Sequence, residues 1–209
     1  MNDKKTLKIL AAGDFHGQST LTKRLAEQAE QENVDLVVLC GDLLESHTET
    51  QDIIKPFLDK GKKVLFVPGN HDGFALGDFL ADFYGIKNLH NSFEAVRSVG
   101  FFGCGGANVG LEALPEEDIF TTLKKGFYYV KGLDKKIMVT HVHPAGTKME
   151  KLSKFVPPST GVLKAVQELK PDILLCSHIH EAEGIEEYLG KTKVINVGRK
   201  GKVFEIPLN

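Results

Sequence analysis

The sequence has no tryptophan, only three cysteines and no long apolar run. Because the cysteine count is odd and no C-x-x-C pair occurs, a disulfide framework and a thiolate zinc site are both disfavoured. Free thiols fit a reducing compartment, so we expect a cytoplasmic protein. No apolar stretch approaches the ~18 residues of a membrane-spanning helix. The charged first residues also lack the apolar length of a signal peptide.

Charge of either sign is not in excess, since 26 Lys and Arg residues face 28 Asp and Glu residues. This balance gives no sign of binding to nucleic acid or to an anionic membrane through the whole molecular surface. Internal repeats and low-complexity tracts are absent as well. With 209 residues and 42% hydrophobic content, the composition is that of an ordinary globular protein. We therefore expect residues 1–209 to form a single domain.

Short runs rich in Val, Ile and Leu alternate with segments of helical periodicity, which predicts an α/β fold. Apolar residues recur at helical spacing over 21–29 and over 162–169, where Ser159 or Thr160 is the expected N-cap. Short strands over 86–104, which resemble a β-meander, and over 184–206 predict a second sheet with mixed pairing. The irregular segments 105–115 and 143–158 are either solvated surface or binding loops. Five runs are expected to be buried strands: Leu7–Ala12, Val34–Cys40, Lys63–Val67, Lys136–Val139 and Asp172–Cys176.

Each of these five strands is followed by Asp, Asn or His. The motifs, in chain order, are G-D-F-H at 13–16, G-D at 41–42, G-N-H-D at 69–72, T-H-V-H at 140–143 and S-H-I-H at 177–180. Taken singly, each motif is weak evidence, because a turn or a helix cap explains it better than a functional site does. Ligands bind at the carboxyl ends of strands in α/β sheets, so we expect these side chains to converge. Carboxylate, imidazole and amide oxygen without thiolate suit Mn²⁺, Fe, Zn²⁺ or Ni²⁺, and the candidate ligands are numerous enough for two metals that clamp a phosphoryl group.

This series of motifs resembles the calcineurin-like metallophosphoesterases, from Asp14 to His180. The end of the chain, with H-I-H-E and N-V-G, is more similar still to the Icc-related phosphoesterases, a branch that resembles class III cyclic-nucleotide phosphodiesterases. The resemblance implies a four-layer α/β/β/α sandwich of two mixed sheets flanked by helices. It also implies hydrolysis of phosphoesters, phosphodiesters before monoesters, by a hydroxide that bridges two divalent cations, with Mn²⁺ favoured.

The resemblance also implies roles for particular residues. Asp42 bridges the two metals, His71 assists the leaving group, and Asp72 orients His71. The first metal is held by Asp14, His16 and His180, and the second by Asn70, His141 and His178. The expected partner is a small phosphoester, a nucleotide being one option. The sequence departs from the family pattern at Ser177, where glycine is usual, and at His143, an additional histidine.

Several alternatives stay open. Ser177 either tightens its loop or contacts substrate, and His143 is either a surface histidine or a substrate contact. Arg199 and Lys200 either bind phosphate or form a solvated charge pair, and His47 lies on a loop near Asp42. A catalytically silent scaffold on the same fold, as in the retromer subunit that resembles these enzymes, is the rival function. Intact ligand positions favour the enzyme, because clustered carboxylates are costly without cations.

Overall fold

The computed structural model describes residues 5–45, 51–110, 113–152 and 155–208. Eleven strands form two sheets within these ranges. The first sheet has the order β11 (Lys202–Pro207), β1 (Thr6–Ala12), β2 (Leu36–Cys40), β3 (Lys63–Val67), β4 (Lys87–Asn88). The second has the order β5 (Ser92–Val96), β6 (Val99–Cys104), β7 (Lys135–Thr140), β8 (Ile173–Cys176), β10 (Thr192–Asn196), β9 (Glu186–Leu189).

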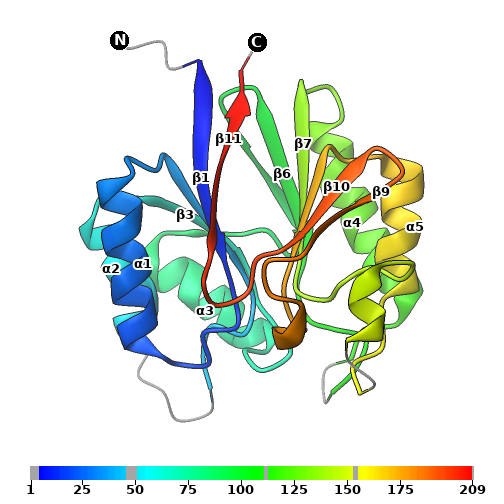
Figure 1. The fold of residues 1–209 in the computed structure, drawn as a ribbon, viewed down its shortest axis with the longest axis horizontal. Coiled ribbons are helices and arrows are strands. Elements are labelled where there is room, and N and C mark those ends of the chain that lie inside the picture. The colour runs from blue at the N-terminus through cyan, green and yellow to red at the C-terminus, as the bar shows by residue number, and fades with distance from the viewer. Residues whose placement is uncertain (1–4, 46–50, 111–112, 153–154, 209) are drawn as a thin grey trace.

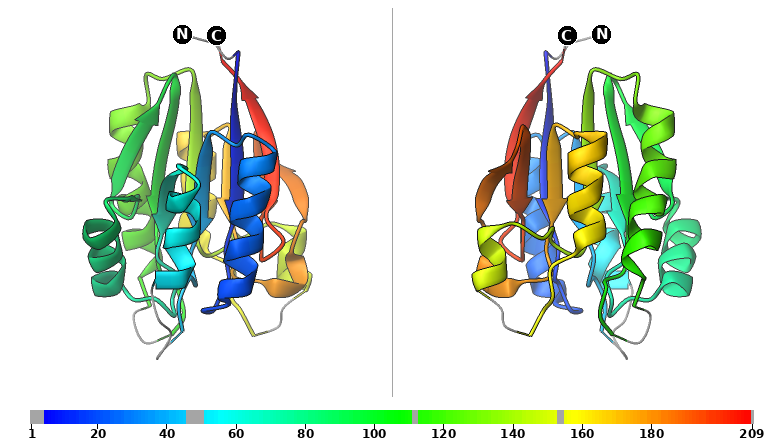
Figure 2. Two further views of the ribbon diagram at one scale, coloured as in Figure 1. Left: turned by 90° about the vertical axis from the view of Figure 1, so that its left-hand side faces the viewer. Right: turned by 90° about the vertical axis from the view of Figure 1, so that its right-hand side faces the viewer.

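Both sheets are mixed. Strands β1 to β4 pair in parallel, and β11 is antiparallel to β1. Strands β6, β7, β8 and β10 also pair in parallel, with β5 and β9 antiparallel at the two edges. The helices cover the outer faces of the sheets (Figures 1 and 2). Helices α1 (Ser19–Gln31), α2 (Gln51–Asp59) and α3 (Phe74–Tyr84) lie on the first sheet, and α4 (Glu116–Val130) and α5 (Thr160–Leu169) on the second. The predicted four-layer sandwich is confirmed.

Three buried clusters correspond to the three interfaces between these layers. Along β1, Ile9 faces the cluster between the sheets while Leu10 faces α1 and α2. Along β6, Phe101 faces the central cluster while Phe102 packs under α4. Successive side chains of a strand point to opposite faces, so a strand that is apolar throughout is buried on both. This is why the expected strands appear as continuous apolar runs in the sequence.

Helix α5 begins and ends as its sequence predicts. The hydroxyl of Ser159 accepts a hydrogen bond from the Val162 amide at 3.0 Å, which satisfies one of the free donors of the first turn. Lys170 ends the helix in the left-handed region, directly before Pro171. The spacing of the apolar residues then places the helix against α4, in the outer cluster of the second sheet.

The predicted β-meander over 86–104 is wrong. Strand β4 pairs in parallel with β3 in the first sheet, whereas β5 pairs with β6 in the second. Leu89, between β4 and β5, is buried in the cluster that joins the sheets. Consecutive short strands with turns have the same local pattern whether they pair with each other or not, so the sequence pattern does not reveal the change of sheet.

Strand β1 begins and β11 ends at the top of Figure 1, and the loops that follow β1 and β8 gather at the bottom. The short 3₁₀ turn η2 (His180–Ala182) lies in this lower group, and a second one, η1 (Lys148–Lys151), lies in the long segment after β7. Among the described residues, no helix combines the length and the apolarity that crossing a membrane requires.

Candidate metal centre

All nine residues proposed for the site lie in loops at the carboxyl ends of five strands. Two follow β1, one follows β2, three follow β3, one follows β7 and two follow β8. In this order they are Asp14 and His16; Asp42; Asn70, His71 and Asp72; His141; His178 and His180. The first sheet therefore supplies six of them and the second sheet three. The predicted convergence at one end of the molecule is confirmed by the distances below.

The donor atoms fall into overlapping groups. Asp14, His16 and His180 present atoms within 4.8 Å of one another, and so do Asp42, His141 and His178. A third group joins Asp42 to His16 and His71. The Oδ2 atom of Asp42 lies 3.3 Å from Nε2 of His141, 3.7 Å from Nε2 of His16 and 4.0 Å from Nε2 of His71. Asp42 is therefore the carboxylate shared by two of the three groups, and His16 links it to the group that contains Asp14.

Asn70 and the backbone around Asp14 complete the cluster. Oδ1 of Asn70 lies 2.9 Å from Nε2 of His141, beside the group that contains Asp42. The amide of His178 donates to both carboxylate oxygens of Asp14 at 3.2 Å, which links the loops after β1 and β8. Nε2 of His180 lies 4.0 Å from Oδ2 of Asp14. The two halves of the cluster are thus connected by polar contacts between the two sheets.

Two glycines allow the loops after β2 and β3 to approach. A Cβ at Gly69 would lie 2.0 Å from Oδ1 of Asp42, and one at Gly41 would lie 2.7 Å from both the Gly69 Cα and Nδ1 of His141. Gly41 also has a φ of +86°, which side chains disfavour. The G-D and G-N-H-D motifs therefore need glycine because the two loops pack backbone to backbone around the Asp42 carboxylate.

Backbone strain is concentrated in the cluster. Eight described non-glycine residues have a positive φ, and four of them are candidate ligands. Their φ angles are 55° at Asp14, 46° at His16, 51° at Asp42 and 73° at His178. Such conformations cost free energy and persist where the surrounding structure holds them, often at functional sites. This distribution supports a site at which side-chain direction matters more than local stability.

Burial and charge set the protonation of the cluster. Burial would raise the pKa of Asp42, but the nearby His141 holds it well below its usual range. Burial would lower the pKa of His141, but Asp42 and Asp14 outweigh it and raise that pKa to about 9. Burial lowers the pKa of His178 to about 3 and also lowers that of His16. The carboxylate of Asp42 is therefore ionised and two of the imidazoles are neutral.

The residues fit divalent cations. The Nε2 atoms of His16 and His178 are buried without a hydrogen-bond partner among the described residues. A buried polar atom that lacks a partner is uncommon and is explained by an unseen ion or water. Ionised carboxylates and neutral imidazoles are the forms that bind divalent metals. The Nε2 lone pairs of His16 and His178, together with the Asp42 carboxylate, are the ligand atoms that a pair of cations would need.

His71 and Asp72 differ in exposure and in contacts. The His71 side chain is 49% exposed and stands edge to face on His16, with 5.0 Å between the ring centroids. Asp72 is buried, and its carboxylate accepts hydrogen bonds from the amides of Gly69 at 2.7 Å, Leu44 at 2.8 Å and Leu43 at 3.2 Å. These contacts fix the loops after β2 and β3 relative to each other. The orientation of His71 by Asp72 stays a prediction.

The two departures from the family pattern are both buried. The Ser177 hydroxyl donates to the Cys40 carbonyl at 2.5 Å and lies 3.1 Å from Nδ1 of His141, which also contacts that carbonyl at 2.8 Å. The hydroxyl therefore tightens the loop and helps to fix the orientation of His141. His143 is fully buried, and both of its ring nitrogens lack partners among the described residues. The alternative of a surface histidine is wrong, because the His143 side chain is inaccessible to solvent. Its backbone is tied to the end of the same segment, where the Ser159 amide donates to the His143 carbonyl at 2.9 Å.

Two further residues gain contacts that sequence reasoning missed. His90 accepts a hydrogen bond from the Gly105 amide at 3.1 Å and packs on Phe74, with 4.4 Å between the ring centroids. It thereby joins the glycine-rich loop after β6 to the helix that follows G-N-H-D. Arg199 reaches His180 from the loop after β10. Neither contact could be predicted from periodicity in the sequence, because both join segments that are far apart in the chain. His47, the other loop histidine considered near Asp42, lies outside the described residues.

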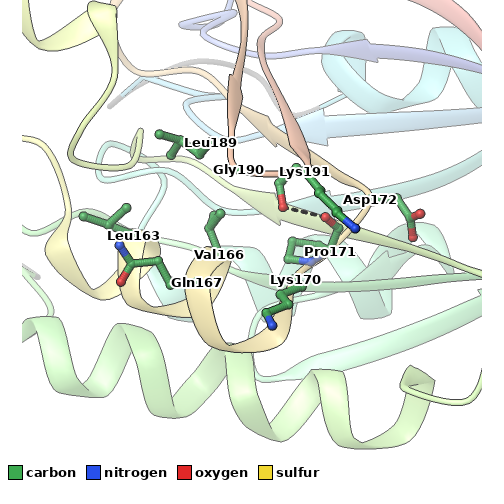
Figure 3. A pocket seen from close by; sticks show the side chains of 10 residues that line it. Leu163, Val166, Gln167, Lys170, Pro171, Asp172, Leu189, Gly190 and Lys191 are labelled. Carbon is green, nitrogen blue, oxygen red and sulfur yellow. Dashed lines mark hydrogen bonds between the residues drawn. The ribbon is translucent and has the colours of Figure 1, made fainter.

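A cavity of about 510 Å³ lies away from this cluster, between α5 and the β9–β10 turn (Figure 3). Leu163, Val166 and Leu189 supply apolar side chains to its lining. Thr192 also lines it and donates a hydrogen bond of 2.6 Å to the Pro171 carbonyl. The cavity lies at the amino ends of β8 and β10 and contains none of the nine site residues. The cavity is therefore separate from the cluster of candidate ligands.

Carboxylates and imidazoles gathered at the strand ends of a two-sheet sandwich define a metal-dependent hydrolase arrangement. The sequence matches the model of the calcineurin-like phosphoesterases over residues 7–182. The chain belongs to this family, so it is a phosphoesterase whose family uses divalent metal ions. Among curated proteins, none is similar enough to this sequence to count as a match.

Solved structures share the fold at low sequence identity. TT1561 from Thermus thermophilus is 20% identical, with a TM-score of 0.75 over 95% of this chain and 98% of that one. A novel archaeal phosphodiesterase is 20% identical, with a TM-score of 0.53 over 96% and 99% of the two chains. A dimetal phosphatase from Danio rerio is 12% identical, with a TM-score of 0.54 over 92% and 87%. These likenesses confirm the fold.

Proposed function

We propose that the chain hydrolyses phosphodiesters in preference to phosphomonoesters, with two divalent cations bound in the cluster. The observation that carries this proposal is the Asp42 carboxylate, which lies within 4.0 Å of imidazole nitrogens from three loops. It forms one group with His141 and His178 and another with His16, which also belongs to the group of Asp14 and His180. A shared carboxylate is what a site for two adjacent cations needs. The likeness in fold to an archaeal phosphodiesterase supports the choice of diesters.

The ligands divide between the two positions. Asp14, His16 and His180 would hold the first cation, and Asn70, His141 and His178 the second, with Asp42 common to both. Bound there, two cations supply a hydroxide nucleophile at neutral pH and neutralise charge on the phosphoryl oxygens. We propose Mn²⁺ as the native metal, because carboxylate, imidazole and amide oxygens without thiolate suit it, with Fe, Zn²⁺ and Ni²⁺ as the competing choices.

His71 is proposed as the general acid. Its ring is half exposed, and its Nε2 atom lies 4.0 Å from the shared carboxylate, so the ring borders both the ligand group and solvent. From that position Nε2 would give its proton to the leaving oxygen of the substrate. The His71 amide donates to Oδ1 of Asp42 at 3.0 Å, which fixes the base of the ring relative to the cluster. Asp72 holds the same loop through its three amide contacts.

The test is a metal-dependent comparison of two chromogenic substrates. Protein stripped of metal is supplied with Mn²⁺, Ni²⁺, Zn²⁺ or Mg²⁺ and assayed with bis-p-nitrophenyl phosphate and p-nitrophenyl phosphate. We expect Mn²⁺-dependent cleavage that favours the diester. Preference for the monoester would overturn the proposed substrate class. A folded protein that binds metal and cleaves neither compound would support the scaffold function, and its binding partners would then be sought.

A matched pair of variants tests the shared carboxylate. Asp42→Ala should lose both cations by elemental analysis, together with all turnover, because it removes the carboxylate proposed to be common to the two positions. Asp59→Asn is the control, since Asp59 is an exposed partner of Lys55 on α2. Full metal occupancy in Asp42→Ala would refute the bridging role.

A further inference from the structure

Arg199 lies at the rim of the first ligand group. Its Nη2 atom is 2.9 Å from Nδ1 of His180 and 3.5 Å from Nε2 of the same ring. Nε2 of His180 lies in turn 4.0 Å from Oδ2 of Asp14. A permanently charged guanidinium therefore stands next to the proposed ligands, at a site that is otherwise built from carboxylates and imidazoles.

The loop that carries Arg199 is fastened to the ligand loops. The Gly13 amide donates to the Gly198 carbonyl at 2.9 Å, and the Val197 amide donates to the Cys176 carbonyl at 2.9 Å. The Asn196 side-chain amide donates to the carbonyls of Ser177 and Ile179, both at 3.2 Å. These contacts reach the loops after β1 and β8. The base of Arg199 is thus held in a fixed relation to the cluster, which reduces the entropy lost when its side chain binds a ligand.

The guanidinium has no anionic partner among the described residues, and its Nε atom is buried without a hydrogen-bond acceptor. The other nearby cation differs, because Lys200 contacts Glu183 through both its amide and its ammonium group. Arg97, remote from the cluster, has the carboxylate of Asp35 at 3.6 Å and donates to the Thr6 carbonyl at 2.8 Å. An unsatisfied, partly buried guanidinium is suited to an anion from outside the chain.

We propose that Arg199 is a substrate-binding residue that donates hydrogen bonds to a non-bridging oxygen of the phosphoryl group of the substrate. The proposal rests on the proposed function and extends it by naming the residue that recognises the negative charge of the phosphoester. A planar guanidinium can contact two phosphoryl oxygens at once, which an ammonium cannot match. The competing role is that Arg199 only positions His180, and the two roles predict different measurements.

The experiment measures binding of inorganic phosphate to the Mn²⁺-loaded protein by calorimetry, for the wild type, Arg199→Gln, Arg199→Lys and the neighbouring control Lys200→Gln. Metal content, thermal unfolding and the kinetics with bis-p-nitrophenyl phosphate are recorded for each. We expect Arg199→Gln to weaken phosphate binding at least ~10-fold, as is typical when a charged hydrogen bond is lost, and to raise KM more than it lowers kcat. Metal content should stay unchanged. Arg199→Lys should recover part of the loss, and Lys200→Gln should match the wild type.

Three outcomes would overturn the proposal. Phosphate affinity of Arg199→Gln equal to that of the wild type would show that the guanidinium does not contact the anion. Loss of one cation in this variant would make Arg199 a positioning residue for His180. A wild type that binds no phosphate would remove the site altogether. Because phosphate binding is measured without turnover, an inactive wild type that binds phosphate through Arg199 would refute the proposed hydrolysis and leave this inference standing.

Discussion

Gly69→Ala tests how tightly the loops after β2 and β3 pack. The added Cβ would lie 2.0 Å from Oδ1 of Asp42 and 2.3 Å from its backbone nitrogen, where ordinary contact begins at 3.4 Å. The loops must separate by ~1 Å to remove this overlap, and overpacking of this kind costs ~1–3 kcal/mol. For a domain of this size each kcal/mol lowers the Tm by ~2–4 °C. We therefore expect the metal-free variant to unfold about 2–12 °C below the wild type.

The same displacement moves the shared carboxylate. Disturbing the groups that orient metal ligands typically costs ~10–100-fold in metal affinity, so the affinity for Mn²⁺ should fall by at least that factor. Circular dichroism melts in EDTA and calorimetric titration with Mn²⁺ measure the two effects separately. Gly132→Ala is the control, because a Cβ there meets nothing within 4 Å. A Gly69→Ala protein that matches this control in both measurements would show that the two loops do not pack as described.

His71→Ala should keep both cations by elemental analysis and lose ~10²–10⁴-fold of its turnover of bis-p-nitrophenyl phosphate; unchanged turnover would remove the assigned role. Burial lowers the pKa of His90 below its ordinary 6.5. The folded protein therefore favours the neutral imidazole, and this contribution to stability is present above pH 6.5. It is lost as the pH falls below 6.5, because the unfolded chain then takes up a proton at His90 more readily than the folded protein does. The free energy of unfolding in urea, measured at pH 7.5 and 5.5, should therefore change less with pH in His90→Asn than in the wild type. The asparagine amide oxygen replaces the acceptor for the Gly105 amide. An equal change in both proteins contradicts this account. A thiol reagent should label no cysteine in the native protein and three in guanidinium, because the three thiols are buried: Cys40, Cys104 and Cys176.

The strands could be predicted closely because they are short, apolar throughout and followed by polar motifs. Lys63–Val67 has the expected bounds, and Leu7–Ala12 differs from β1 by one residue. The position of the candidate site could be predicted because ligands bind at the carboxyl ends of strands. That rule applies without knowing which strands are neighbours in the sheets. Helix α4 is not among the expected elements, although its buried positions Ile119, Leu123 and Val130 have helical spacing. That signal was present in the sequence and was missed.

Other features depend on contacts that local patterns do not record. The assignment of β4 and β5 to different sheets depends on partners that lie elsewhere in the chain. His143 is buried although it lies in an irregular segment, and irregular segments have no periodicity from which burial can be inferred. Arg199 contacts His180 because the loop after β10 is held by hydrogen bonds to the end of β8 and to the loop after β1. Tertiary packing, and not propensity, decided each case.

The distribution of the ligands over two sheets has a consequence for assembly of the chain. Asp14 and His178, which are joined by two hydrogen bonds, are separated by 164 positions. A folding intermediate in which only one of the two sheets has formed would hold only part of the proposed metal ligands, whichever sheet forms first. Cation binding of native affinity therefore requires both sheets to have docked, and the bound cations would act as a late non-covalent cross-link between the two ends of the chain. Metal uptake during refolding is then a reporter of sheet docking, distinct from the earlier formation of secondary structure.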